Sequence, residues 1–191
     1  GKIKVLMGIR DQIRPGVKKD LQRLKKLGVK NLVVLSGDNQ GTVDLVARVL
    51  GLTEAHGHML PEDKSAYIKK LQAEGRIVAF VGDGVNDSPS IALAQIGIAM
   101  GSGTDVAIET SDVVLMNSDF SRLPHALGLT KATARNMRQN IIIAVGVVLV
   151  LLASVFFSEW MNMSIGMLVH EASILVVILN GMRLLRYRLR A

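Results

Sequence analysis

The pattern of apolar and polar residues changes near residue 130. Before that point, short apolar runs alternate with segments of helical period, which predicts alternating strands and helices. The apolar runs at residues 31–36 and 77–81 are typical of strands buried on both faces, and a further β-type run covers residues 5–9. Residues 1–129 are therefore predicted to form an α/β domain with a doubly wound, mostly parallel sheet and helices on both faces.

Proline and glycine mark the ends of the predicted helices. Pro15 stands in the first turn of one helix and Gly28 follows it, whereas Gly51 and Gly75 end the next two. These signals predict helices over residues 15–27, 39–50 and 61–74. The segments that continue the alternation cover residues 88–94, 97–100, 105–110 and 112–115.

Two long apolar stretches follow residue 130. Residues 141–157 carry no charge, and residues 163–182 are interrupted by His170 and Glu171. A membrane span needs about 20 apolar residues, with a range near 17–25. Basic residues flank both stretches, which places both ends in the cytoplasm and the turn at residues 158–162 outside. The flanking basic residues are Lys131, Arg135, Arg138, Arg183, Arg186, Arg188 and Arg190.

We therefore interpret residues 130–191 as a transmembrane hairpin with a basic cytoplasmic tail, in contact with a lipid bilayer. The alternative is a buried helical hairpin in a soluble protein.

The composition narrows the choice of protein class: 49% of residues are apolar, 4% are aromatic and the formal net charge is +7. Such hydrophobicity excludes disorder, and the absence of cysteine excludes disulfide scaffolds and thiolate metal sites within the chain.

An isoelectric point near 9.9 is also found in nucleic-acid-binding proteins. Much of the basic charge here flanks apolar segments, as at a membrane surface, so no nucleic acid is expected as a partner. The first residues form no charged-then-apolar leader. Because the chain opens at Gly1 without a methionine, we expect a processed or excised piece.

Two predicted strands end in acidic, glycine-rich turns, at residues 36–39 (SGDN) and 82–89 (GDGVNDSP). Ligands in such folds bind at the carboxyl ends of the strands. Small residues let backbone amides and a hydroxyl group approach a phosphate. Asp83 and Asp87 stand four positions apart around the second turn, and their hard oxygens suit Mg²⁺ beside a phosphate.

Five motifs, in order, resemble the P-type ATPases, a family of the haloacid dehalogenase superfamily. The resemblance implies an incomplete haloacid dehalogenase-like phosphorylation domain with a Rossmann-like sheet, which uses Mg²⁺ and takes ATP as substrate. The motifs cover almost all of the predicted soluble part. They are I-R-D-x-x-R-P at residues 9–15, L-S-G-D-N at 35–39, P-E-D-K at 61–64, G-D-G-V-N-D-S-P at 82–89 and M-G-S-G-T-D at 100–105.

The resemblance also assigns roles to single residues. Ser36 is expected to bind the phosphoryl oxygens, and Lys64 to neutralise the charge that develops on the transferred phosphoryl group. Asp83 is expected to bind Mg²⁺, with Asp87 supporting that site, and Asn86 to hydrogen-bond the phosphorylated centre. The full catalytic set comprises Ser36, Gly37, Asp38, Lys64 and Asn86.

The D-K-T-G-T segment that carries the nucleophilic Asp of this family is absent from the sequence. The resemblance therefore implies a C-terminal part of a transporter whose partners are its nucleotide-binding domain, its actuator domain and its earlier membrane helices. The isolated chain is not expected to form an aspartyl-phosphate. One alternative is a non-catalytic membrane module that binds Mg²⁺ and phosphate or a partner ATPase. Another is a membrane-anchored phosphatase, which needs a D-x-D nucleophile pair that we do not find.

The second apolar stretch points to the heavy-metal branch of the family. Residues 180–184 resemble its N-x-x-R-L ending, and residues 169–173 (VHEAS) resemble the H-E-G-[GS]-T segment of the members that handle cobalt, iron(II), zinc or cadmium. A carboxylate at mid-membrane is costly unless it binds a ligand or a partner group. Imidazole and carboxylate ligands suit borderline divalent metals. The expected transported-metal ligands are His170, Glu171 and Ser173; the alternative is a polar pair that binds a neighbouring helix.

His56 and His58 form an H-x-H pattern just before the P-E-D-K segment. This pattern on a strand binds metal in some proteins. A surface strand end is the more common setting, and both interpretations stay open from the sequence.

Overall fold

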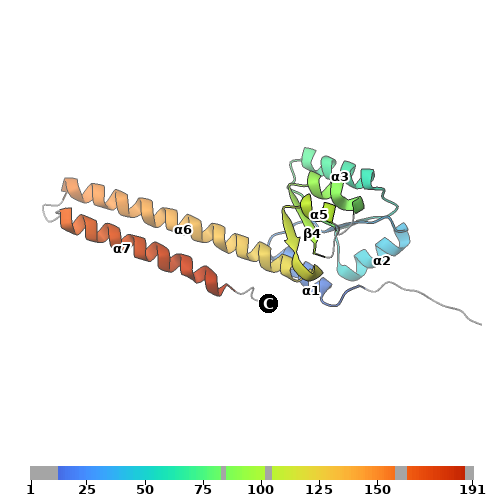
Figure 1. Cartoon of the computed structure of the whole chain (residues 1–191), viewed down its shortest axis with the longest axis horizontal. Coiled ribbons are helices and arrows are strands. Elements are labelled where there is room, and N and C mark those ends of the chain that lie inside the picture. Colours follow the sequence, from blue (N-terminus) through green and yellow to red (C-terminus); the bar gives the residue numbers. More distant parts are fainter. Residues whose placement is uncertain (1–12, 83–84, 102–104, 158–162, 188–191) are drawn as a thin grey trace, which may run out of the picture. The chain divides into compact units, whose positions relative to one another are not determined.

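The computed structural model describes residues 13–82, 85–101, 105–157 and 163–187 (Figure 1). The chain divides into two compact units, residues 1–124 and residues 125–191. We describe each unit by itself. The strand predicted at residues 5–9 and the turn predicted at residues 158–162 lie outside the described residues.

The strands of the first unit form two parallel sheets. β1 pairs with β2, with Val34 opposite Ala55, and the second sheet has the order β3-β4-β5, with Ile98 of β4 between Val81 and Val113. The parallel α/β architecture is confirmed, although the described residues divide the predicted single sheet into two. The strands are β1 (Val33–Leu35), β2 (Glu54–His56), β3 (Ala79–Gly82), β4 (Ile96–Met100) and β5 (Val113–Leu115).

Most helices of this unit begin and end at the residues that the sequence marks, but α1 begins at Val17, so Pro15 precedes the helix and does not lie in its first turn. The Asn39 side chain accepts a hydrogen bond from the Thr42 amide and caps α2, and Gly51 ends that helix with a φ of 70°. Pro61 opens α3, where the Leu60 amide donates to the Asp63 carboxylate at 2.9 Å. The helices are α1 (Val17–Lys26), α2 (Gln40–Leu50), α3 (Pro61–Ala73), α4 (Ser88–Leu93) and α5 (Asp105–Glu109), with the 3₁₀ turns η1 (Val85–Asp87) and η2 (Met116–Ser118).

A small apolar core holds α4 against the second sheet. Ile91, Ala99 and Ala107 are buried together, and Phe80 and Ile108 pack around them. Gly97 of β4 lies so close to Ile91 that an added Cβ would overlap the Ile91 carbonyl oxygen. This close approach fixes where α4 packs against β4.

Three strands differ from the sequence-based prediction. β1 is half-buried along its length, so the prediction of burial on both faces is wrong for it. Ile77 is 81% exposed and precedes β3, because the Val78 amide donates to the Gln95 side chain at 2.9 Å and the strand ladder begins only at Ala79. β2 was not predicted as a strand, since Glu54-Ala55-His56 is too short and polar to show a strand pattern.

The second unit contains the helix α7 (Met163–Met182), the 3₁₀ turn η3 (Arg183–Arg186) and all but the first three residues of the helix α6 (Arg122–Phe157). Figure 1 shows α6 and α7 side by side and antiparallel. Both are long and apolar enough to cross a membrane, and none of either apolar window is buried. A hairpin in the core of a soluble protein would bury these windows, so the membrane interpretation is favoured. α6 begins at Arg122, well before its apolar stretch.

Candidate functional site

The turn after β1 is organised by its own side chains. The Ser36 hydroxyl donates to the Asp38 carboxylate at 2.8 Å, and the Asp38 amide donates back to the Ser36 hydroxyl at 3.2 Å. Backbone bonds tie this turn to the segment after β2: the His58 amide donates to the Asp38 carbonyl at 2.7 Å. Gly37 is exposed at the tip. The turn leads directly into the amino end of α2, whose dipole favours a negative charge there.

Lys64 and Asp87 meet although 23 positions separate them. The Lys64 ammonium donates to Asp87 Oδ1 at 2.7 Å, and the two side chains are only 15% and 17% exposed. Lys64 comes from the first turn of α3, and Asp87 ends η1 and is the N-cap residue of α4. A paired, largely shielded ammonium can be directed at a developing negative charge, which is the requirement of phosphoryl transfer.

Gly82, the last residue of β3, makes room for the Asp87 carboxylate. A Cβ at this position would lie 2.6 Å from Asp87 Cβ and 2.9 Å from its Oδ2. The glycine therefore allows the turn to fold back so that the carboxylate lies over the strand end. Ser65, the residue after Lys64, adds a hydroxyl contact of 3.3 Å to the buried Ser90 of α4.

The structure brings together Lys64 with Asp87, and Ser36 with Asp38. Asn86 is exposed on η1, and Asp83 lies outside the described residues. Within the described part of the chain, no group of three or more His, Cys, Asp or Glu side chains is placed to hold a metal ion. The site assignments from the sequence thus stay predictions, with one ion pair and one hydroxyl–carboxylate pair as their geometric basis.

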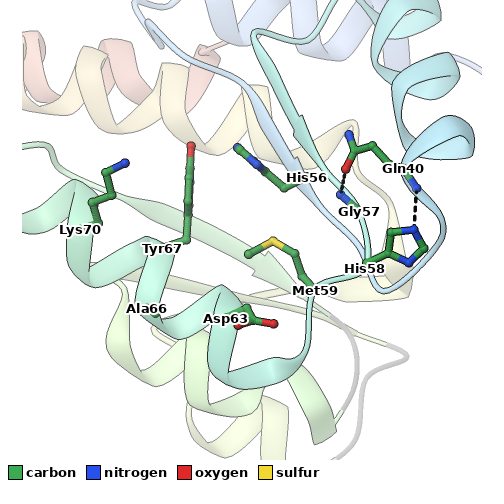
Figure 2. Close-up of a pocket in the computed structure, with 9 residues that line it drawn as sticks. All are labelled: Gln40, His56, Gly57, His58, Met59, Asp63, Ala66, Tyr67 and Lys70. Carbon is green, nitrogen blue, oxygen red and sulfur yellow. Dashed lines mark hydrogen bonds between the residues drawn. The ribbon is translucent and has the colours of Figure 1, made fainter.

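An open groove of about 480 Å³ lies beside the Ser36 turn and is not lined by Lys64 or Asp87 (Figure 2). The Gln40 side chain lines one side of the groove. Its oxygen accepts from the Gly57 backbone amide at 2.6 Å, and its nitrogen donates to the Ala55 backbone carbonyl at 3.0 Å. Gly57 approaches the Asp38 carbonyl so closely that a Cβ would come within 2.8 Å of it. Sequence reasoning missed Gln40, because an exposed glutamine at a helix start carries no distinctive signal.

The H-x-H histidines face different partners. His56 contacts the Glu54 carboxylate at 3.4 Å and lies against the Tyr67 ring, whereas the His58 ring accepts from the Gln40 backbone N–H at 3.4 Å. Figure 2 shows the two imidazoles on opposite sides of Met59. This divergence favours the strand-end interpretation of the pattern.

A hydrogen bond between Tyr67 and Glu54 shifts the pKa of both groups. The Tyr67 hydroxyl donates to the Glu54 carboxylate at 2.6 Å. Burial, followed by the bond to Glu54, raises the pKa of Tyr67 to about 12. The bond from Tyr67, followed by the contact with His56, lowers the pKa of Glu54. Both shifts favour the bonded state at neutral pH.

In the second unit, the predicted metal ligands lie in α7. His170 and Glu171 are exposed, and Ser173 is half-buried with its hydroxyl donating to the His170 carbonyl at 2.6 Å. That bond occupies the hydroxyl hydrogen of Ser173 within its own helix. The oxygen lone pairs of Ser173 therefore stay available to a metal, as do the imidazole of His170 and the carboxylate of Glu171.

Comparison with known proteins agrees with the fold and the order of the motifs. Two haloacid dehalogenase-like hydrolase models match residues 2–95 and 64–127. A probable cadmium-transporting ATPase of Staphylococcus aureus (strain MRSA252) is 39% identical over 96% of this chain and 25% of its own length. The zinc-transporting ATPase of Bacillus subtilis (strain 168) is 40% identical over 94% of this chain and 28% of its own.

A solved structure extends the match to both units. The crystal structure of a zinc-transporting PIB-type ATPase in the E2.Pi state superposes with a TM-score of 0.80 and 37% identity, over 93% of this chain and 29% of that one. The chain therefore belongs to the P-type ATPases of the haloacid dehalogenase superfamily, and its relatives are heavy-metal-transporting members. It spans about a quarter of the length of the curated relatives that it matches.

Proposed function

We propose that this chain is part of an ATP-driven exporter of a divalent heavy metal, working through an aspartyl-phosphate and Mg²⁺. The single observation that best supports the hydrolytic part is the shielded Lys64–Asp87 pair at the strand ends. The relatives named for cadmium and zinc transport support a divalent heavy metal as the transported ion. The protein would lie in a cell membrane, with the first unit and both chain ends on the cytoplasmic side.

A segment beyond this sequence would supply the nucleophilic carboxylate, since D-K-T-G-T is absent. In the described residues, β1 pairs with β2 alone and β3 with β4 alone, so each has an edge without a partner strand. A strand that pairs there would place its carboxyl end beside Ser36 and the Lys64–Asp87 pair. Ser36 would then hold a phosphoryl oxygen, and Lys64 would offset the charge of the transferred group.

The donor set at the end of β3 fits Mg²⁺. Asp87 offers a carboxylate whose Oδ2 is directed over Gly82, and Asp83 would add a second hard oxygen donor. Mg²⁺ usually keeps several waters and takes only one or two carboxylates, so two aspartates suffice. When bound, the ion would neutralise phosphoryl oxygens. The part of Asp87 is to hold Lys64 and to present its second oxygen to that site.

Glu171 and His170, together with Ser173, would bind the transported metal. Glu171 and His170 are exposed on a helix that is mostly apolar, and a charge at mid-membrane costs about 2.5–3.5 kcal/mol on insertion scales. Imidazole with carboxylate suits Zn²⁺, Cd²⁺, Co²⁺ or Fe²⁺ better than Cu⁺. Nucleotide-binding and actuator domains and further membrane helices are the proposed partners in the intact protein.

The test uses the intact transporter in proteoliposomes, with ATPase activity measured across Zn²⁺, Cd²⁺, Co²⁺, Fe²⁺ and Cu⁺. We expect stimulation by divalent metals. Glu171→Gln keeps the shape, removes the charge and is expected to abolish or shift this stimulation. Phosphorylation from inorganic phosphate should survive in that variant, because it uses the cytoplasmic site alone. Unchanged stimulation in both Glu171→Gln and His170→Ala would make the pair structural and remove the argument for a divalent cargo.

Asp83→Asn changes the proposed cytoplasmic Mg²⁺ site and leaves the proposed metal ligands of α7 intact. The amide is nearly isosteric but is a poorer ligand for Mg²⁺, so Mg²⁺-dependent phosphorylation should be lost. Metal binding to α7 should be unaffected. A normal phosphoenzyme level at ordinary Mg²⁺ would refute the role of Asp83.

A further inference from the structure

Three asparagines join the two long helices at one end of the second unit. The buried Asn136 of α6 donates to the Asn180 carbonyl of α7 at 2.7 Å. Asn180 donates to the Asn140 side-chain oxygen at 2.8 Å, and Asn140 donates to the Asn136 oxygen at 3.2 Å. We call these three residues, together with Arg183, the amide clamp. The Arg183 guanidinium donates to the Asn180 side-chain oxygen at 3.1 Å.

Most of the polar groups of the amide clamp are paired. The side-chain oxygen of each asparagine accepts one hydrogen bond, Asn136 and Asn140 each donate one, and Asn180 donates two, the second to the Gln139 side-chain oxygen at 3.4 Å. The Asn180 carbonyl lies in the last turn of α7, where carbonyls lack a partner within an α-helix. Asn136 supplies that partner. Such a network has one good geometry, so it specifies how α7 is placed along and around α6.

The apolar parts of the two helices contribute much less to fixing how α7 is placed along and around α6. Leu149 and Leu168 are 60% and 72% exposed, and a Cβ added at Gly146 or Gly166 would meet nothing within 4 Å. Small residues at these two positions are therefore not used for close helix approach. In lipid, apolar side chains gain little by facing one neighbour rather than another, so directional bonds set the register.

The rotation fixed by the amide clamp decides where the proposed metal ligands point. Successive residues of a helix are about 100° apart, which puts Ser173 within about 20° of the Asn180 face and Glu171 roughly opposite to it. The burial agrees, since Ser173 is half-buried and Glu171 is exposed. His170 lies about 15 Å along α7 from Asn180. A turn or slide of α7 on α6 would move both ligands.

We propose that Asn136, Asn140, Asn180 and Arg183 are positioning residues of the transported-metal site: they hold the rotation and register of α7 so that Glu171 faces away from α6. The ligands that complete the site then come from a segment other than α6. This inference rests on the proposed function for the identity of the site. The clamp itself rests on the contacts alone and can be tested without transport.

The first test measures register in this chain, which has no cysteine, reconstituted in phosphatidylcholine nanodiscs. Leu149→Cys and Leu168→Cys carry spin labels, and pulsed electron paramagnetic resonance gives the distance between α6 and α7. We expect one narrow distribution. Asn136→Leu and Asn140→Leu should widen or shift it, and Asn136→Asp, which keeps the shape but loses the donor, should do the same. Ser154→Ala is the matched control, because Ser154 bonds to Leu151 of its own helix.

The second test places the same variants in the intact transporter. The metal concentration for half-maximal ATPase stimulation should rise roughly threefold to tenfold, the range expected for loss of an interhelical hydrogen bond. Phosphorylation from inorganic phosphate should stay unchanged, which a general loss of folding would not allow. Arg183→Gln, with a shorter neutral donor, should give a smaller rise.

The outcomes separate the two proposals. An unchanged distance distribution in both leucine variants overturns the clamp as a register device. A widened distribution with unchanged metal dependence overturns the positioning role. A wild-type transporter without metal-stimulated hydrolysis overturns the proposed function instead, and the spin-label distances still decide whether the clamp sets the register.

Discussion

The two units join distant segments by different kinds of polar contact. In the first unit the contact is an ion pair, Lys64–Asp87, whose side chains are 15% and 17% exposed. In the second it is a set of neutral amides at the end of apolar helices, with Arg183 as its one charged member. Burying charge is costly where water is excluded, whereas amides can satisfy one another there. Under the two proposals, the ion pair acts on a developing charge and the amides fix the placement of two helices.

The largest expected effect comes from breaking the ion pair. Lys64→Met in the intact protein should lower the rate of phosphorylation from ATP by about 10²–10³, the loss typical of one preorganised electrostatic contact. The helix distance in the second unit should not change. Rapid-quench measurement of the phosphoenzyme gives the rate, and Lys69→Met on the exposed side of α3 serves as control. Normal phosphorylation would show that Lys64 is a structural partner of Asp87.

The next largest effect is expected from filling the space that Gly82 leaves for the Asp87 side chain. Gly82→Ala puts a Cβ 2.6 Å from Asp87 Cβ, so the turn must move. We expect a loss of about 1–3 kcal/mol in unfolding free energy, as for other overpacked sites. Denaturant unfolding of the chain measures it. Gly41→Ala, whose Cβ would meet only the Asn39 side chain at 3.4 Å, is the control, and equal losses in both variants would contradict the packing argument.

The cap of α2 should have a smaller effect. The Asn39 side chain accepts from the Thr42 amide at 2.9 Å, and Asn39→Ala should cost about 1 kcal/mol. Hydrogen exchange should become faster at Thr42 and stay unchanged in α4. Because the cap adjoins the Ser36 turn, Asn39→Asp should retain most of the protection. Equal exchange in wild type and Asn39→Ala would show that the cap does not stabilise the turn.

The smallest effect concerns the Tyr67–Glu54 bond. Folding raises the Tyr67 pKa from 10.0 to about 12, so its contribution to stability is present below pH 10 and is lost as the pH rises toward 12. The lowered Glu54 pKa has the opposite sign: its contribution is present above pH 4.5 and is lost as the pH falls below that value. Glu54→Gln should lower the Tyr67 pKa toward 10.0, measured by tyrosinate absorbance in a Tyr187→Phe background. A value still near 12 would leave burial as the whole cause.

Sequence reasoning predicted the parts of the fold that depend on local signals. Gly51 and Pro61 mark helix ends, and uncharged length marks the apolar part of α6, so these elements were placed correctly. β2 was missed because a three-residue polar strand is specified by its neighbour β1 rather than by its own pattern. The burial of Ile77 was mispredicted because hydrophobicity does not show where a ladder begins.

The candidate site divides in the same way. The motifs indicated that Lys64 and Asp87 serve one site, and the structure adds that they form a direct ion pair. The hydrogen bonds of Gln40 and of Asn136 could not be predicted, because amide side chains acquire their partners only after distant segments have packed. Sequence periodicity carries no information on such contacts.

The number of residues between paired strand positions affects how the first unit folds. β1 pairs residue 33 with residue 54, whereas β4 pairs residue 98 with residue 113, and every described pair is parallel. Parallel strands cannot form from a tight hairpin, so each pairing must first close a crossover loop. Loops of these lengths differ little in closure entropy, and we expect the two sheets to nucleate independently. Pulse-labelled hydrogen exchange during refolding would then show amides of β1 and β4 gaining protection in separate phases, and docking of Lys64 against Asp87 would be the later event that unites them.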